Sequence, residues 1–191
     1  GLESEYIRCA AKDVNGNLWF GTNNGLTRYN IKTEKFKTFT YKNGVALQIE
    51  DIAIGKNGIV WVASAESGIF RFDVKTEKFK SYYNIIPSKK TTHIHRSESG
   101  KLIISSNDKG IFICDGQMVR AKSVHLKGKG ETIPHVNEIR NNGKDQVLLA
   151  TNQGVYGLNI ESRKSEKKLK DLFDAFENLN VSDVYYQKSS G

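Results

Sequence analysis

The sequence predicts an all-β fold, built from repeated four-stranded antiparallel sheets that stack as the blades of a β-propeller. The first observation is a repeat, because the hexapeptide Lys-Thr-Glu-Lys-Phe-Lys at residues 32–37 occurs again at residues 75–80. The second is that each repeat contains four short segments rich in β-branched and aromatic residues, separated by Gly, Asn, Asp or Ser. A repeat of about 40 residues with this strand-like texture favours propeller blades over a helical solenoid.

The second repeat shows the predicted unit most clearly. In the first repeat, residues 16–22 read Gly-Asn-Leu-Trp-Phe-Gly-Thr, and they return at residues 58–64 as Gly-Ile-Val-Trp-Val-Ala-Ser. The Asn-Gly pairs at 15–16 and 57–58 supply the positive φ that tight hairpins need. The four strands of the second repeat are expected at residues 48–54, 59–64, 68–73 and 78–83.

The whole chain, residues 1–191, is predicted to be a partial β-propeller. The third and fourth repeats keep the glycines and the apolar alternation but have Ile103 and Leu148 at the tryptophan position. A surplus first strand predicts an open arc that belongs to a larger propeller, for which we expect seven blades. The repeats are expected at approximately 5–42, 47–84, 90–123 and 134–170, followed by a short helical insertion at 171–179 and the start of a fifth blade at 181–191.

The apolar spacing from Ser165 to Leu179 is that of one face of a short helix, which departs from the strand pattern of the rest of the chain. We expect this helix to cap its own blade, and the alternative is a docking element for a partner.

The composition is that of a globular chain, with 38% hydrophobic and 26% charged residues among 191. No apolar run approaches the ~18 residues of a membrane span, and residues 1–5 lack the basic and apolar regions of a signal peptide. Gly1 stands where an initiating methionine is expected, which suggests a piece of a longer protein. The net charge of +8 comes from lysines scattered over turns, so no nucleic-acid partner is predicted. Cys9 and Cys114 fall in predicted strands of different repeats and are expected to be buried and unbonded.

Residues 13–30 read Asp-x-x-Gly-Asn-Leu-Trp-Phe-Gly-Thr-x-x-Gly-Leu-x-Arg-Tyr-Asn, and this pattern resembles the two-component regulator propeller repeat. The resemblance implies the periplasmic sensor region of a hybrid two-component histidine kinase held in the inner membrane. It further implies that the chain binds a ligand, such as an oligosaccharide, without catalysing a reaction. The signal would then pass to a histidine kinase outside these residues.

Residues that recur in register in successive repeats are expected to serve packing. Trp19 and Trp61 occupy one strand position in two repeats, where an aromatic ring fills the space between blades. The same interpretation is applied to four further aromatic residues, Tyr29, Phe36, Phe72 and Phe79.

Residues that break the repeat are the candidates for function, and most of them lie in the loops between blades and in the hairpins between second and third strands. In a propeller these loops emerge on one face. Aromatic platforms flanked by hydrogen-bonding groups suit an oligosaccharide. The predicted ligand-binding residues are Tyr41, Glu66, Tyr83, His93, Asn107, Asp108, His135 and Asn152.

Two alternatives remain open. The chain could be a protein–protein interaction scaffold, with other propeller blades or a second copy as its partner. It could also be a streptogramin-lyase-like enzyme, whose repeats also carry a Gly-Asn-Leu-Trp run and which uses a divalent metal and a histidine base. Zinc needs three or four ligands, and no matching Cys or carboxylate motif accompanies His93, His95 and His135. No metal, cofactor or catalytic residue is therefore predicted.

Overall fold

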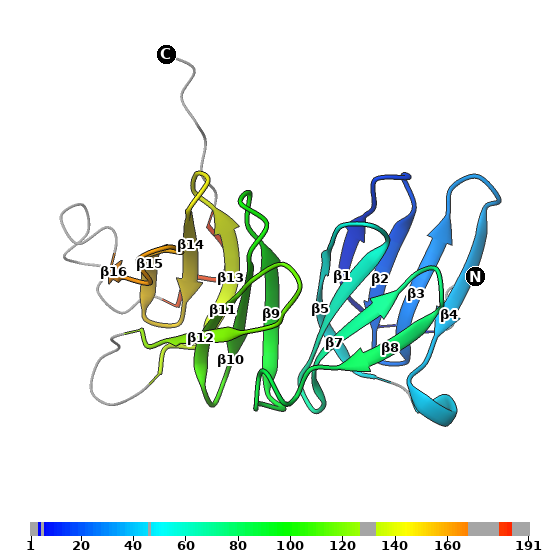
Figure 1. Cartoon of the computed structure of the whole chain (residues 1–191), viewed down its shortest axis with the longest axis horizontal. Coiled ribbons are helices and arrows are strands. Elements are labelled where there is room, and N and C mark those ends of the chain that lie inside the picture. Colours follow the sequence, from blue (N-terminus) through cyan, green and yellow to red (C-terminus); the bar gives the residue numbers. More distant parts are fainter. Residues whose placement is uncertain (1–3, 5, 46, 127–132, 168–179, 185–191) are drawn as a thin grey trace, which may run out of the picture. The chain divides into compact units, whose positions relative to one another are not determined.

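The computed structural model describes residues 4, 6–45, 47–126, 133–167 and 180–184. These residues form four antiparallel four-stranded sheets, and in each sheet the strands are neighbours in chain order (Figure 1). The first sheet contains β1 (Ile7–Lys12), β2 (Leu18–Thr22), β3 (Gly25–Asn30) and β4 (Lys35–Phe39). The second sheet contains β5 (Ile49–Ile54), β6 (Ile59–Ser64), β7 (Gly68–Asp73) and β8 (Lys78–Ser81). The third sheet contains β9 (Thr91–Arg96), β10 (Leu102–Ser106), β11 (Gly110–Cys114) and β12 (Ala121–Val124). The fourth sheet contains β13 (Val136–Asn141), β14 (Gln146–Thr151), β15 (Gly154–Asn159) and β16 (Ser165–Lys167).

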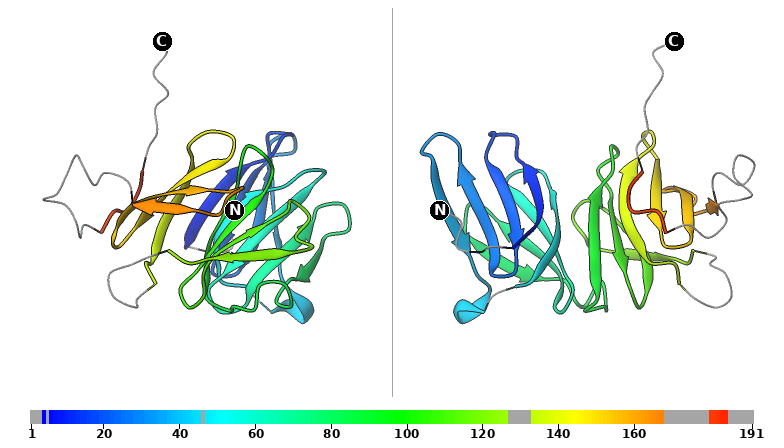
Figure 2. Two further views of the ribbon diagram at one scale, coloured as in Figure 1. Left: turned by 60° about the vertical axis from the view of Figure 1, so that its left-hand side comes forward. Right: turned by 180° about the vertical axis from the view of Figure 1, so that it is seen from behind.

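The chain divides into two compact units, residues 1–94 and 95–191. The first unit holds the sheets β1–β4 and β5–β8, and the second holds the sheet β13–β16 and most of the sheet β9–β12. Figure 2 shows the same strand order in the sheets from two further directions. A short 3-10 helix, η1 (Lys42–Gly44), lies between β4 and β5. Among the described residues, no helix has the length and apolar character needed to span a membrane.

The predicted strands of the second repeat are confirmed to within two residues at each end. The predicted segments 59–64 and 68–73 coincide with β6 and β7, whereas β8 ends at Ser81 instead of residue 83. The first strands β1, β5 and β13 each contain a bulge, at Arg8, Glu50 and Asn137 respectively. A bulge leaves one residue outside the regular ladder and re-aims its side chain.

The two Asn-Gly turns have different conformations. Asn57 and Gly58 both have positive φ, at 55° and 74°, as expected for the turn between β5 and β6. In the turn between β1 and β2 only Gly16 has positive φ, because the Asp13 carboxylate accepts hydrogen bonds from the backbone N–H of Asn15 and Asn17.

The core of the first unit lies between its two sheets. Trp19 is fully buried and packs edge-on against Phe72 and in a stacked arrangement with Phe39. Its indole Nε1 donates to Asp13 Oδ2 over 2.9 Å, and the Arg28 guanidinium lies 5.7 Å from its ring centre. Trp61 is also buried, at 2% exposure, so the packing role predicted for both tryptophans is confirmed.

The core of the second unit is aliphatic. Ile103, which occupies the tryptophan position, is fully buried with Ile111 and Val124 from the same sheet. These side chains pack with apolar residues of the last sheet, among them Val147 and Leu149. The loss of tryptophan in the third repeat therefore keeps an apolar core but makes it smaller.

Two expectations need correction. Phe36 is 38% exposed and is not a core residue, because its side chain lies on the face of the sheet β1–β4 opposite to the core; its ring packs against Tyr29, at 4.8 Å between ring centres. Residues 165–167 form strand β16, so the helix that the apolar spacing predicted does not begin at Ser165. The proposed helical insertion, 171–179, lies outside the described residues. Of the predicted fifth blade, residues 181–184 are described, and the Val181 N–H donates to the Thr151 carbonyl over 2.9 Å.

Candidate ligand-binding face

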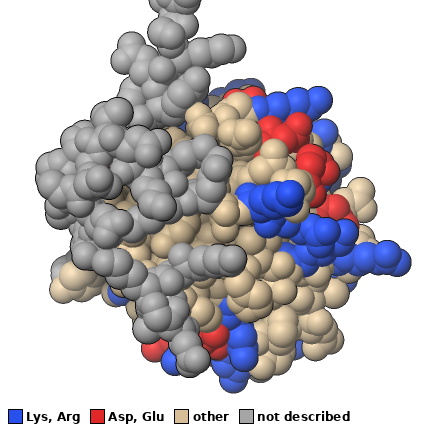
Figure 3. Space-filling view, turned by 90° about the vertical axis from the view of Figure 1, so that its left-hand side faces the viewer, with Lys and Arg blue, Asp and Glu red and all other residues tan. Residues whose placement is uncertain are grey.

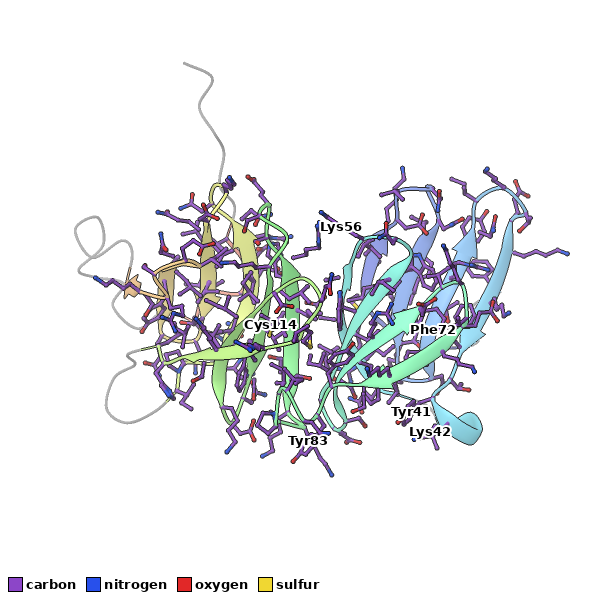
Figure 4. The ribbon with its side chains drawn as sticks, viewed as in Figure 1. Tyr41, Lys42, Lys56, Phe72, Tyr83 and Cys114 are labelled. Carbon is purple, nitrogen blue, oxygen red and sulfur yellow. The ribbon has the colours of Figure 1, made fainter. Side chains whose placement is uncertain are left out.

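Each sheet has two ends that differ in chemistry. At one end, which we call the loop face, lie the hairpins between second and third strands and the loops that enter the first strands. At the other, the turn face, lie the turns between first and second strands and between third and fourth strands. Figure 4 shows Tyr41 and Tyr83 at one end of the first unit and Lys56, from the turn between β5 and β6, at the opposite end.

The turn face has the same pattern of side-chain to backbone hydrogen bonds in every sheet. A carboxylate or amide at the end of the third strand accepts hydrogen bonds from backbone N–H groups of the turn that follows. This residue is Asn30, Asp73, Asp115 and Asn159 in the four sheets. A non-glycine residue with φ between 55° and 59° follows in each turn, at Glu34, Glu77, Met118 and Arg163. The repeated polar residues of this face are therefore used to form turns.

Buried hydroxyl groups stabilise hairpins of the loop face through hydrogen bonds to the backbone. Thr22 and Thr151 are fully buried, and each hydroxyl donates to the carbonyl oxygen of the glycine three residues later and accepts a backbone N–H. Ser106 accepts from the Lys109 N–H in the same way. Several residues at the hairpin tips, among them Glu66, Asn107 and Asn152, have exposed side chains.

A polar network joins the two sheets of the first unit at the loop face. Arg8, the bulge residue of β1, donates from Nη1 to Glu50 Oε2 over 2.8 Å and from Nε to Asn23 Oδ1 over 2.9 Å. Glu50 is the bulge residue of β5, and it also accepts from Gln48 over 3.1 Å. A cation, a carboxylate and two amides thus lie side by side on one surface.

A second polar network lies at the same end of the last sheet. The backbone N–H of His135 donates to Asn152 Oδ1 over 2.8 Å, and His135 Nδ1 lies 3.2 Å from Asn137 Oδ1. Asn137, the bulge residue of β13, donates from Nδ2 to Asn180 Oδ1 and to the Val181 carbonyl, over 2.7 and 2.8 Å. Amide and imidazole groups make this network rich in both donors and acceptors, which suits hydroxyl groups.

The structure places the four predicted residues of the first unit separately. Tyr41 is half-buried, with its ring packed edge-on against Phe70 at 5.0 Å. Tyr83 is 43% exposed after β8, and Glu66 is exposed in the hairpin between β6 and β7. His93 is half-buried in β9. Of these four, Tyr83 and Glu66 present the larger exposed surfaces.

The predicted residues of the second unit form two pairs. Asn107 and Asp108 are exposed in the hairpin between β10 and β11, where Asp108 accepts from the Ser106 hydroxyl over 2.5 Å. His135 and Asn152 are far apart in sequence but are joined by the backbone hydrogen bond described above and by the Asn152 N–H, which donates to the His135 carbonyl over 3.0 Å. The structure therefore brings together one predicted pair from different loops.

The imidazole of His95 has a lowered pKa. Burial is the main cause that lowers the pKa of His95, and the nearby Arg140 acts in the same direction, while Asn141 and Glu138 oppose the change. Its Nε2 and the Asn141 Oδ1 are both buried without a hydrogen-bond partner. His95 is therefore neutral at physiological pH, and the described residues contain no group of three or more His, Cys, Asp or Glu side chains arranged to hold a metal ion.

Sequence reasoning missed the bulge residues. Arg8, Glu50 and Asn137 lie at equivalent places in their first strands and were not among the predicted site residues. A usable signal existed, because this position differs in charge and type from repeat to repeat while the apolar residue just before it, Ile49 or Val136, is conserved in character. The alternation of apolar and polar residues along a strand does not by itself predict a bulge.

The surface charge is mixed. In the view of Figure 3, Lys and Arg side chains lie beside Asp and Glu side chains and form no continuous basic surface. Among the described residues, two lysines pair with carboxylates of a neighbouring sheet: Lys37 with Glu77, over 2.6 Å, and Lys101 with Glu161.

The model of the two component regulator propeller family matches residues 1–24, which confirms the recognition of this repeat in the sequence. A comparison with curated proteins finds no match.

Solved structures with the same fold fall into several functional classes. The extracellular domain of the hybrid two component system BT3049 from B. thetaiotaomicron has a TM-score of 0.66 and 20% identity, over 87% of this chain and 25% of that one. Virginiamycin B lyase from Staphylococcus aureus has a TM-score of 0.71 and 17% identity, over 86% of this chain and 56% of that one. PorZ, a bacterial surface component of the type-IX secretion system of Porphyromonas gingivalis, has a TM-score of 0.65 and 18% identity, over 86% and 28%.

These similarities establish a β-propeller fold and not an activity. The chain spans a quarter of the length of the BT3049 extracellular domain, 25%.

Proposed function

We propose that the chain is part of the extracellular or periplasmic sensor propeller of a hybrid two-component system. The observation that supports this most strongly is the two component regulator propeller repeat in residues 1–24, combined with the shared fold of extracellular domains from such systems. In this proposal the chain binds and does not catalyse. Ligand occupancy favours one arrangement of the sensor, and that preference passes to a histidine kinase outside residues 1–191.

The ligand is proposed to be an oligosaccharide that binds at the loop face. Two features support this choice: the turn face has its repeated polar residues committed to turns, and the loop face presents neutral amides, an imidazole and exposed aromatic rings. Three of the predicted residues could reach a sugar because their side chains are exposed: Asn107 in the hairpin between β10 and β11, His135 just before β13 and Tyr83 just after β8.

The test uses the natural full-length protein in cells with a transcriptional reporter and enzymatic digests of complex polysaccharides as the stimulus. The variant Asn107→Ala with His135→Ala removes polar groups from the loop face. The matched control, Lys75→Ala with Lys78→Ala, removes two exposed side chains of the turn face. We expect the first pair to reduce the response at least tenfold and the control pair to leave it unchanged. A response lost with the control pair and kept with the loop-face pair would place recognition on the other face.

Two further candidates come from proteins that share the fold. If the chain is an enzyme like virginiamycin B lyase, purified protein with Mg²⁺ would open a streptogramin B ring. The fold shared with PorZ favours a protein-binding scaffold, and then the loop-face variant would lose a protein partner with no change in response to any digest.

A further inference from the structure

The polar network around Arg8 uses most of its own hydrogen-bond acceptors and leaves donors over. The Arg8 guanidinium donates to Asn23 Oδ1 and to Glu50 Oε2, and a guanidinium carries more N–H groups than these two acceptors use. The second carboxylate oxygen of Glu50, Oε1, accepts from Gln48 over 3.1 Å. Asn23 Oδ1 and both oxygens of Glu50 are therefore occupied within the network, whereas N–H groups of Arg8 and of the Asn23 amide remain for a ligand.

The Arg8 side chain is held in one orientation. Its Nε donates over 2.9 Å to Asn23 in the hairpin between β2 and β3, and its Nη1 donates over 2.8 Å to Glu50 in β5. An oriented guanidinium loses little conformational entropy when it binds. Its planar set of donors also matches the two oxygens of a carboxylate, which a lysine ammonium does not.

The cation of this network is more exposed than the carboxylate that pairs with it. The side chain of Arg8 is 38% exposed, and that of Glu50 is 19% exposed. A ligand that approaches the loop face therefore contacts the guanidinium more readily than the carboxylate.

The surrounding loop face of the first unit carries an excess of positive charge. Its described charged side chains are the cations Arg8, Lys42, Lys89 and Lys90 and the carboxylates Glu50 and Glu66. Figure 4 shows Lys42 at the same end of this unit as Tyr41 and Tyr83. Because Glu50 is paired with Arg8, Glu66 alone among these side chains opposes the charge of the lysines, which favours an anionic ligand.

The second unit has a neutral residue at the equivalent place. The bulge residue there is Asn137, whose Nδ2 donates to Asn180 Oδ1 and to the Val181 carbonyl over 2.7 and 2.8 Å. The donors of this amide are thus used within the protein. A charged group of a ligand is therefore expected at Arg8 and not at Asn137.

We propose that Arg8 binds a carboxylate group of the ligand, so that the oligosaccharide bound at the loop face contains uronic acid residues. The carboxylate accepts hydrogen bonds from the remaining N–H groups of Arg8 and from Asn23 Nδ2. Glu50 is a positioning residue, because it holds the guanidinium in place through the 2.8 Å hydrogen bond. This inference rests on the proposed function, since it specifies the ligand of the same face.

The test uses the natural full-length protein in cells with a transcriptional reporter. The acidic stimuli are digests of pectin, alginate and hyaluronan, each paired with a counterpart whose carboxyl groups have been reduced to alcohols. Digests of starch, arabinan and galactan are the neutral stimuli. A digest of a sulfated galactan without uronic acid distinguishes sulfate from carboxylate recognition.

Three variants separate the charge of Arg8 from its structural contacts. Arg8→Gln removes the guanidinium, whereas Glu50→Gln breaks the same ion pair and keeps the guanidinium. Lys37→Gln is the matched control, because it breaks another ion pair between the same two sheets, that of Lys37 with Glu77 at the turn face.

We expect an acidic digest to stimulate the wild-type protein and its carboxyl-reduced counterpart to need a concentration about tenfold higher or more. Arg8→Gln should raise the half-maximal concentration of the acidic digest by about tenfold or more and leave that of the reduced counterpart unchanged. Glu50→Gln should lower the half-maximal concentration of the acidic digest, because it removes a negative charge beside the guanidinium. Lys37→Gln should change neither value.

The inference would be overturned, with the oligosaccharide proposal still standing, by a response to neutral digests and none to acidic ones. An Arg8-dependent response to the sulfated galactan alone would overturn it in the same way. An acidic response that Arg8→Gln leaves unchanged, or equal losses in Arg8→Gln and Glu50→Gln with every digest, would also overturn it. If the wild-type protein responds to no digest, the oligosaccharide proposal itself fails and this inference fails with it.

Discussion

Trp19 is predicted to be the residue on which the first unit depends most. Its indole fills the core between β1–β4 and β5–β8 at 0% exposure and contacts Phe39 and Phe72. Trp19→Ala removes these contacts and leaves a cavity, which costs about 3 to 5 kcal/mol for a large aromatic residue in a core. It also removes the donor to Asp13, a loss of about 1 to 3 kcal/mol for a hydrogen bond to a charged group.

The two contributions can be separated by Trp19→Phe. Phenylalanine keeps most of the ring contacts but cannot donate to Asp13, so we expect a loss of about 1 to 3 kcal/mol, clearly smaller than for alanine. Urea unfolding of residues 1–191, followed by circular dichroism, measures both variants at pH 7.

The pH dependence gives an independent check. Partial burial acts to raise the pKa of Asp13, but hydrogen bonds from Trp19 and Asn17 outweigh it and hold the pKa below its usual value. A carboxyl with a lowered folded-state pKa contributes stability above its unfolded pKa, and this contribution is lost as the pH falls through the folded-state pKa. The difference between wild type and Trp19→Phe should therefore narrow below about pH 4. A Trp19→Ala variant with unchanged stability, or a difference that widens in acid, would refute this account of the core.

Two further predictions follow from close contacts and burial. A Cβ at Gly21 would lie 2.4 Å from the Cys9 Sγ and 2.5 Å from the Ile49 Cγ2, so Gly21→Ala should destabilise the protein by about 1 to 3 kcal/mol through overpacking. Thermal unfolding measures this loss of stability. An unchanged melting temperature would show that the neighbouring side chains shift freely. Burial, with a smaller contribution from the Asp115 carboxylate, raises the pKa of the Cys114 thiol to about 12. Iodoacetamide at pH 8 should therefore modify Cys114 at least a hundredfold more slowly than a free cysteine. Mass spectrometry over time measures the rate, and rapid modification of the native protein would contradict the burial of this thiol.

The strands and the tryptophan positions could be predicted because each repeat supplies an independent copy of the same pattern. An assignment such as residues 59–64 as a strand rests on residues 18–22 as well, and both are strands. Phe36 was wrongly placed in the core because recurrence in register shows that a residue faces another blade but not that the other blade is present. Its equivalent, Phe79, is covered by its neighbours, whereas Phe36 is not.

The candidate site was harder to predict because its geometry comes from a bulge and from pairs that lie about one repeat apart. Arg8 and Glu50 are 42 residues apart, and Asn137 and Asn180 are 43 apart. His135 and Asn152 were both predicted as ligand-binding residues, but nothing in the sequence indicated that two hydrogen bonds join them.

The bulge also explains why one strand can serve two purposes. Residues such as Ile49 and Ile52 keep the alternation that buries a first strand in the core, while the inserted Glu50 is released from that alternation and can change without cost to packing. Arg8, Glu50 and Asn137 all occupy this bulge position and make polar contacts. Substitution of the bulge residue therefore alters the surface and leaves the sheet intact. Substitutions at this position should therefore change recognition or blade pairing more than they change the stability of the sheet that carries them.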